Sequence, residues 1–191
     1  MQSGNDYRQV VRITQVDSTK SFISFSCGVD DMDSFIHKEL QLSVRNGFCR
    51  LYRVTMDGSV VALFALTFDS LYLDYEDKQD LMQLSNINIG RYYSETFWNK
   101  HHYPALEISY FAVAKSMHHR GLGAFLIETI SHKAATQSFA GCQFLTVEAL
   151  INRQTSYNAV GFYQKQNFRP CEYLNPLKGT LRMFRPLYML K

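Results

Sequence analysis

The residues with the clearest chemical potential form a basic, glycine-containing turn within the sequence AVAKSMHHRGLGA at positions 112–124. Gly121 and Gly123 have no Cβ, so the backbone there can adopt positive φ and approach a ligand closely. A helix is predicted from Gly121 to Gln137, because its apolar side chains recur every three or four positions. The first turn of a helix has unpaired N–H groups and partial positive charge, which attract anions. The turn therefore predicts a phosphate-type site, and on this motif alone a capping turn or close glycine packing stays open as the alternative.

The composition is that of an ordinary globular protein. The chain has 191 residues, 46% of them hydrophobic and 19% charged, and we expect a single domain over residues 1–191. The net charge of +3 is too small to indicate a nucleic-acid partner. The four cysteines form no Cys-x-x-Cys pair, and no apolar run is long enough to span a membrane, so we expect free thiols and a cytoplasmic protein with no membrane partner. A solvated basic face is expected near the C-terminus, formed by Lys165, Arg169, Lys178, Arg182, Arg185 and Lys191.

Hydrophobic periodicity predicts alternating strands and helices. A hairpin of strands 48–55 and 59–68 is expected around Asp57-Gly58, a strong turn signal. A helix is expected to begin near Asp31, with Asp30 as its cap, and to end at Asn46-Gly47. The segment 69–104 is the least regular, with one short helix predicted in it. The remaining elements are strands at 8–16, 105–114, 142–150 and 183–190 and short helices at 78–84 and 156–166, which together indicate an α/β fold with a mixed sheet.

A second motif, NAVGFYQKQNF at positions 158–168, lies downstream of the glycine turn. The two motifs in this order resemble the GNAT superfamily of acetyl-CoA-dependent N-acetyltransferases. The first is similar to that family's Gln/Arg-x-x-Gly-x-Gly/Ala pyrophosphate loop, and the second to its Ala-x-x-Phe-Tyr-x-x-x-Gly-Phe ending. The resemblance covers residues 105–170. His118 stands where the family has Gln or Arg, and Asn167 replaces the glycine of the ending, where asparagine also tolerates left-handed backbone geometry.

The resemblance implies an α/β (α+β) fold with a central mixed, mostly antiparallel sheet flanked by helices. It also implies a cleft for acetyl-CoA, the cosubstrate, where strand 105–114 splays from strand 142–150. Backbone groups of Phe111 and Val113 would hold the pantetheine arm and polarise the thioester carbonyl. Ser156 stands where many members have an asparagine that binds this arm, so Asn152 or Asn158 is the expected substitute. The residues expected to bind acetyl-CoA are Phe111, Ala112, Val113, His118, His119, Arg120, Gly121, Leu122, Gly123, Ala124 and Asn158.

The implied reaction needs a neutral amine, an oxyanion donor and a proton for the leaving thiolate. The backbone N–H of Val113 is the family-like oxyanion donor. Tyr163 is the candidate general acid, since a phenol with a pKa of about 10 can donate to the thiolate of coenzyme A; the alternative is a core tyrosine. Glu107 is the candidate base, and the alternatives are an exposed or ion-paired carboxylate with water as the base. Tyr110 and His102 are weaker candidates for the base.

Three hypotheses for the function stay open. The first is acetyl transfer to a primary amine by direct attack, with the segment 69–104 shaping the acceptor site through residues such as Phe97 and Trp98. The second is a toxin-type GNAT that acetylates aminoacyl-tRNA, since residues 25–35 look similar to the first helix of such toxins. In that case the basic residues near the C-terminus would contact phosphates. The third is a non-catalytic acyl-CoA-binding module.

Two histidine pairs, His101-His102 and His118-His119, raise the question of a metal site. Adjacent residues of an extended backbone point to opposite sides, and no carboxylate or cysteine lies at ligand spacing, so no metal is expected. The expected partners are acetyl-CoA and an amine acceptor, with nucleic acid only in the aminoacyl-tRNA hypothesis. The sequence leaves the oligomeric state open, a homodimer included.

Overall fold

The computed structural model describes residues 7, 10–18, 22, 24–84, 91–136, 140–152, 157–175 and 179–187. The chain divides into two compact units. Unit 1 consists of Met1–Thr67 and Glu107–Lys133, and unit 2 of Phe68–Leu106 and Ala134–Lys191. The chain passes from one unit to the other within strands β3 (Ser59–Tyr72) and β4 (His102–Val113) and within helix α5 (Leu122–Thr136).

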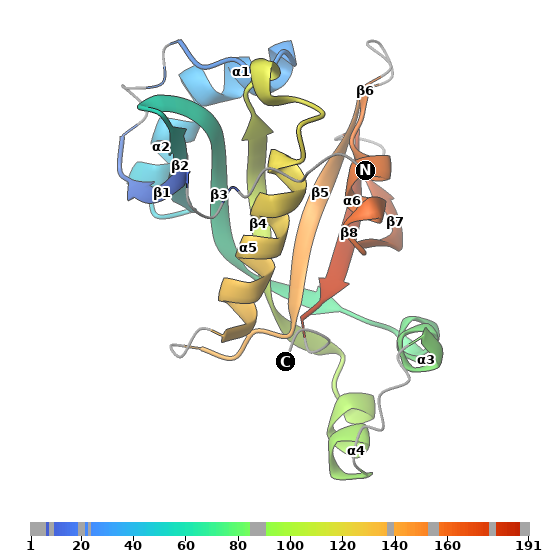
Figure 1. Cartoon of the computed structure of the whole chain (residues 1–191). Helices are drawn as coiled ribbons and strands as arrows, with labels where there is room; N and C mark the ends of the chain where they lie inside the picture. Colours follow the sequence, from blue (N-terminus) through green and yellow to red (C-terminus); the bar gives the residue numbers. More distant parts are fainter. Residues whose placement is uncertain are drawn as a thin grey trace. The chain divides into compact units, whose positions relative to one another are not determined.

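The strands of unit 1 follow the order β1-β2-β3-β4, where β1 is Val11–Val16 and β2 is Arg50–Met56 (Figure 1). β1 pairs with β2 and β2 with β3 in antiparallel registers. The predicted hairpin is confirmed: Asp57 and Gly58 both have positive φ, at 49° and 77°, which is the geometry that a two-residue hairpin turn favours. β1 begins at Val11 and is shorter than the predicted strand.

The N-terminal helical region of unit 1 contains two helices, α1 (Asp30–Lys38) and α2 (Leu40–Arg45), where the sequence predicted one. The predicted end is confirmed, since Gly47 follows α2 with a φ of 74°. The predicted cap is wrong, because Asp30 is already helical and it is the Asp33 carboxylate that turns back to the preceding loop. This carboxylate accepts hydrogen bonds from the Cys27 backbone N–H (2.8 Å) and the Ser26 hydroxyl (2.6 Å), and these bonds lower its pKa despite some burial.

Unit 2 contains the irregular segment and the C-terminal part of the chain. Its strands β5, β8 and β7 are antiparallel neighbours in that order, and β6 pairs with β5. The segment predicted to hold one short helix forms two. The elements of unit 2 are α3 (Tyr75–Leu84), α4 (Arg91–Asn99), β5 (Phe144–Asn152), β6 (Tyr157–Asn158), α6 (Val160–Lys165), β7 (Arg169–Asn175) and β8 (Thr180–Pro186).

A buried lysine connects the two helices of the irregular segment. Lys78 of α3 is only 2% exposed, and its ammonium donates hydrogen bonds to the carbonyls of Lys100 (2.6 Å) and Trp98 (3.2 Å) at the end of α4. A cation at the C-terminal carbonyls of a helix is favourable because those oxygens carry partial negative charge. Phe97 of α4 is 4% exposed and packs into the core of unit 2, and its part in an acceptor site stays a prediction.

Among the described basic residues near the C-terminus, Lys165 is exposed as predicted for a solvated face, whereas Arg185 is not part of such a face. Arg182 bridges Asp69 (2.7 Å) and Glu148 (3.4 Å) within unit 2, and Arg185 is buried. Lys178 and Lys191 lie outside the described residues. The two carboxylates hold the Arg182 side chain, which remains 28% exposed, within unit 2.

The structure combines helices with a mostly antiparallel sheet, which confirms the predicted α/β (α+β) fold class. Among the described residues, no helix is both long and apolar enough to cross a membrane. The cysteines within the same ranges are all free thiols, and burial raises the pKa of each.

Candidate active site

The basic glycine turn of unit 1 connects β4 to α5. After a single 3₁₀ turn at Lys115–Met117, His119 and Gly121 adopt positive φ, at 59° and 86°. The first hydrogen bond of α5 runs from the Phe125 N–H to the Gly121 carbonyl (3.1 Å). The N–H groups of residues 122–124 therefore precede the first helical bond, as the N–H groups of an anion-binding helix start do.

The side chains of this turn are open to solvent. His118, His119, Arg120 and Gly121 are all exposed, while Leu122 is fully buried and fixes the start of α5 in the core. A β-carbon built on Gly121 would meet no atom within 4 Å, so glycine is needed there for its φ and not for space. The turn thus offers backbone donors and an arginine to an anion.

Backbone hydrogen bonds hold the start of this turn. The Ala114 N–H donates to the Val61 carbonyl (2.9 Å) and the Lys115 N–H to the Ser26 carbonyl (3.1 Å). The Nε2 atom of His118 lies 3.0 Å from the carbonyl oxygen of Val113. A carbonyl can only accept a hydrogen bond, so the Nε2–H group is the donor. This hydrogen bond helps to fix the conformation of the turn.

Tyr7 makes a contact with the turn that the sequence did not indicate. Its hydroxyl donates a hydrogen bond of 2.7 Å to the carbonyl of Arg120, and its ring lies 5.6 Å from that of Phe125. The side chain is 5% exposed. No local pattern could have revealed this pair, because the two residues are 113 positions apart in the chain.

The part of β4 that belongs to unit 1 separates the candidate residues onto two faces. Ile108, Tyr110 and Ala112 are buried, whereas Glu107 and Val113, on the other face, are half-buried. Phe111 shares that second face. The strand therefore places the candidate base on the same face as the residues predicted to hold the pantetheine arm.

Tyr110, a weaker candidate for the base, packs against helix α1 of unit 1. Its ring stacks on Phe35 at a centroid distance of 5.6 Å, and its hydroxyl lies 3.4 Å from the carbonyl of Met32 in α1. His102, the other weak candidate, lies in unit 2, where it is exposed and its Nδ1 is 3.3 Å from the Ser70 hydroxyl. The described residues contain no group of three or more side chains that could hold a metal ion.

Tyr163 lies on α6 in unit 2. Its side chain is 5% exposed, and its ring contacts those of Phe162 at 5.1 Å and Phe168 at 5.3 Å. Burial, with a smaller contribution from the nearby Tyr157, raises the pKa of Tyr163 well above the ordinary value of 10. The phenol is therefore protonated throughout the neutral range and is a weaker acid than an exposed tyrosine.

Both ends of α6 depend on asparagine. The Asn158 side-chain oxygen accepts a hydrogen bond of 2.8 Å from the Val160 N–H at the start of the helix. Asn167 follows its end with a φ of 62°, which confirms that asparagine adopts the left-handed geometry expected of the family's glycine. Ser156 and the side chain of Asn152 lie outside the described residues.

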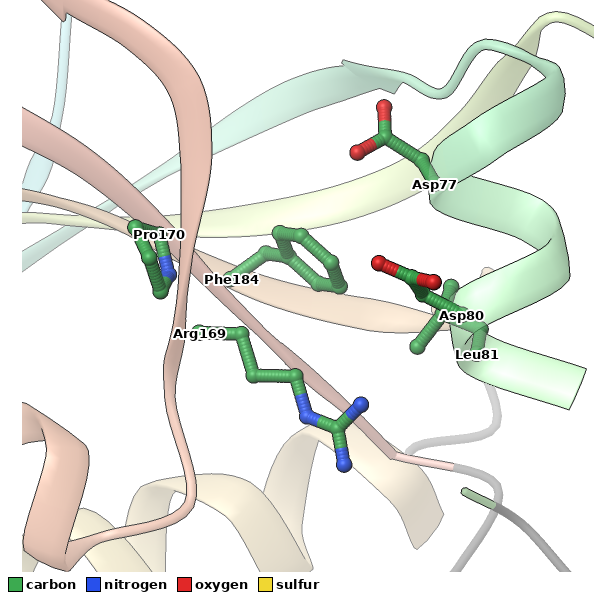
Figure 2. Close-up of a pocket in the computed structure, with 6 residues that line it drawn as sticks. All are labelled: Asp77, Asp80, Leu81, Arg169, Pro170 and Phe184. Carbon is green, nitrogen blue, oxygen red and sulfur yellow. The ribbon is translucent and has the colours of Figure 1, made fainter. Parts of the chain in front are cut away.

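A hollow of about 350 Å³ opens beside α3 in unit 2 (Figure 2). Leu81 and Phe184 form its buried apolar wall, and the charged groups at its edge are Asp77, Asp80 and Arg169. The predicted catalytic and acetyl-CoA-binding residues do not line this hollow. It is thus a feature of unit 2 apart from the predicted chemistry.

Comparison with known proteins relates part of the chain to a family of known activity. A family model described as acetyltransferase (GNAT) domain matches residues 82–170, which include the glycine turn and Tyr163. Among curated proteins, none matches the chain in sequence.

Solved structures with the same fold include bacterial toxins. One is described only as a bacterial toxin, with a TM-score of 0.67 at 16% identity over 95% of this chain and 93% of that one. Another is AtaT complexed with acetyl-methionyl-tRNAfMet, with a TM-score of 0.67 at 21% identity over 94% and 96%. A third is AtaTR bound with acetyl-CoA, with a TM-score of 0.65 at 19% identity over 95% and 96%. Residues 82–170 thus match a GNAT acetyltransferase domain and the fold is that of these solved structures, which confirms the predicted family resemblance, fold and acetyl-CoA-dependent acyltransferase class.

Proposed function

We propose that this chain transfers an acetyl group from acetyl-CoA to the α-amino group of an aminoacyl-tRNA. One observation carries the proposal: the similarity to AtaT, solved with acetyl-methionyl-tRNAfMet, extends over 94% of this chain and 96% of that one. The similarity thus includes the parts of the chain outside the 82–170 match. Complexes of AtaT with the antitoxin AtaR are also among the similar structures, so a small antitoxin is the expected protein partner.

In this proposal the turn from His118 to Ala124 binds the pyrophosphate of acetyl-CoA. Its support is the positive φ at Gly121, the N–H groups that precede the first bond of α5, and the exposed Arg120. Backbone groups of Phe111, Ala112 and Val113 would hold the arm that carries the thioester. Asn158 would contribute to the same arm in addition to its contact with α6.

The reaction would proceed by direct attack of the amine. The nitrogen forms a bond to the thioester carbon, and the carbonyl oxygen becomes an oxyanion stabilised by the Val113 N–H. The C–S bond then breaks, the nitrogen releases a proton to water or a carboxylate, and the sulfur takes a proton from the Tyr163 hydroxyl. Water returns a proton to the phenol. The phenol is protonated at neutral pH, and burial, which raises its pKa, makes it a weaker acid than an exposed tyrosine; the Phe-Tyr motif, and not this shift, supports the role.

The choice of acceptor changes how much a base is needed. An α-amino group has an unperturbed pKa of about 7.7–8.0, so about one molecule in ten is already neutral at pH 7. A lysine amine, with a pKa of about 10.4, is almost wholly protonated. An aminoacyl-tRNA acceptor therefore needs Glu107 only weakly, whereas a lysine-like acceptor needs a dedicated base.

The transfer of acetyl groups to charged tRNA should arrest growth when the chain is expressed in bacteria. We expect arrest with the unmodified chain and normal growth with Tyr163→Phe, which keeps the buried ring but lacks the proton. The matched control is Tyr52→Phe in β2, a tyrosine stacked on Phe64 in unit 1. Growth arrest by Tyr163→Phe at equal expression would contradict the catalytic role of this phenol, and normal growth with the unmodified chain would contradict the toxin-type function.

A further inference from the structure

Tyr7 is anchored at the start of β1. Its carbonyl accepts hydrogen bonds from the backbone N–H groups of Val10 (3.2 Å) and Val11 (3.1 Å). Its hydroxyl, at the other end of the residue, donates to the Arg120 carbonyl at 2.7 Å. The residue thus connects the first strand of unit 1 directly to the basic glycine turn.

The accepting carbonyl belongs to the most unusual part of that turn. Arg120 lies between His119 and Gly121, whose φ values are 59° and 86°. Backbone of this kind is costly for non-glycine residues and must be held by its surroundings. The ring of Tyr7, fixed against Phe125 of α5, allows the hydroxyl little freedom to leave this carbonyl.

A hydrogen bond to the Arg120 carbonyl also sets the direction of the next N–H. The Arg120 C=O and the Gly121 N–H belong to one planar trans peptide, in which the two groups point to opposite sides. When Tyr7 holds the carbonyl on its own side, the N–H of Gly121 points away from Tyr7. That N–H is the first of the donors that the turn presents before α5 begins.

We propose that Tyr7 is a positioning residue for the pyrophosphate of acetyl-CoA. It orients the Arg120–Gly121 peptide so that the Gly121 N–H faces the anion, and it does so through its hydroxyl. This inference rests on the proposed binding of acetyl-CoA by the turn. A merely structural tyrosine would contribute to stability alone and would not distinguish ligands with a pyrophosphate from ligands without one.

The test compares Tyr7→Phe with Tyr52→Phe, since each change removes one hydroxyl from a ring-stacked tyrosine of unit 1. Dissociation constants are measured calorimetrically for acetyl-CoA and for S-acetylpantetheine, which has the arm and thioester but no pyrophosphate. Loss of one hydrogen bond that orients a donor should weaken acetyl-CoA binding about three- to tenfold in Tyr7→Phe. S-acetylpantetheine binding should be unchanged, and Tyr52→Phe should bind both ligands as the unmodified chain does.

Two results would overturn the inference. One is equal acetyl-CoA affinity in Tyr7→Phe and the unmodified chain; the other is an equal loss of affinity for both ligands, which would mark a general structural effect. Thermal unfolding of both variants shows whether each is folded. If the unmodified chain fails to bind acetyl-CoA at millimolar concentration, the proposed cosubstrate site falls, and this inference with it. If the unmodified chain and Tyr7→Phe both bind acetyl-CoA tightly, the role of Tyr7 is refuted and the proposed acetyl-CoA site is not.

Discussion

Replacement of Gly121 by alanine separates the backbone's contribution to the basic turn from that of its side chains. A β-carbon at this position would meet no atom within 4 Å, so the substitution introduces no steric clash. The φ of 86° is the sole source of the cost. An L-residue in left-handed backbone costs about 1–2 kcal/mol.

Alanine also restricts the unfolded chain, which returns about 0.4–1 kcal/mol of stability. The net loss for Gly121→Ala is therefore about 1 kcal/mol, or about 2–4 °C in melting temperature for a chain of this size. Gly47 offers a matched control, with a φ of 74° and open space around its β-position, at the end of α2. Gly161 in α6 also has open space but no positive φ, so alanine there should stabilise by about 0.5–1 kcal/mol.

Urea unfolding of the three variants, with acetyl-CoA titrations beside it, measures both effects. Gly121→Ala and Gly47→Ala should lose similar stability, but acetyl-CoA affinity should fall in Gly121→Ala alone. If the turn relaxes and withdraws one N–H from the pyrophosphate, the loss is about tenfold or more, since hydrogen bonds to charged groups contribute about 1.5–3 kcal/mol. A stabilised Gly121→Ala variant with unchanged affinity would refute both the assigned backbone strain and the role of the turn.

Four further predictions concern charge and ionisation. Arg182→Met should destabilise the chain by about 2 kcal/mol in urea unfolding, since it leaves two partly buried carboxylates without their cation; a neutral result would show that the bridge contributes nothing. Burial raises the pKa of Cys27 to about 12 and that of Cys171 to about 11, so both thiols should resist labelling at pH 8, and rapid labelling of the folded chain would contradict their burial. Because these folded pKa values exceed the ordinary 9.0, the thiols' contribution to stability should be present below pH 9 and fall as the pH rises above it. Glu107→Gln should reduce acetylation of aminoacyl-tRNA about twofold or less and that of lysine-like amines far more, and equal losses for both would contradict the pKa argument for the acceptor.

The local features of the fold were predictable where short-range geometry determines them. Asp57-Gly58 fixes a two-residue hairpin by its backbone alone, and Gly121 fixes the entry into α5 in the same way. Asn167 takes the left-handed conformation that its position after α6 requires. In each case the residue type and its immediate neighbours carry the physical information.

The features that the sequence did not predict depend on distant contacts or on strand edges. β7 contains Pro170, which lacks a backbone donor and weakens the strand pattern, and the structure tolerates it because β7 ends the order β5-β8-β7. The contact between Tyr7 and Arg120 joins residues that no local pattern relates. From the sequence alone, Arg182 is expected at the surface. Its ion pairs with Asp69 and Glu148 become visible only when the fold of unit 2 brings these residues together.

Sequence motifs indicate the candidate catalytic and acetyl-CoA-binding residues, and the structure shows what surrounds each of them. Tyr163 is buried against aromatic rings with a raised pKa, and Glu107 shares a strand face with Val113. The Nε2–H group of His118 donates a hydrogen bond to the carbonyl of Val113. Their chemical roles stay predictions that the variants above examine.

The most direct test of the central claim is the release of coenzyme A thiol from acetyl-CoA, measured with a panel of charged tRNAs, free amines and peptides. We expect rapid release with at least one aminoacyl-tRNA, N-acetylation of its amino acid, and a rate about a hundredfold or more lower for Tyr163→Phe. Release with small amines or peptides but with none of the charged tRNAs would contradict it.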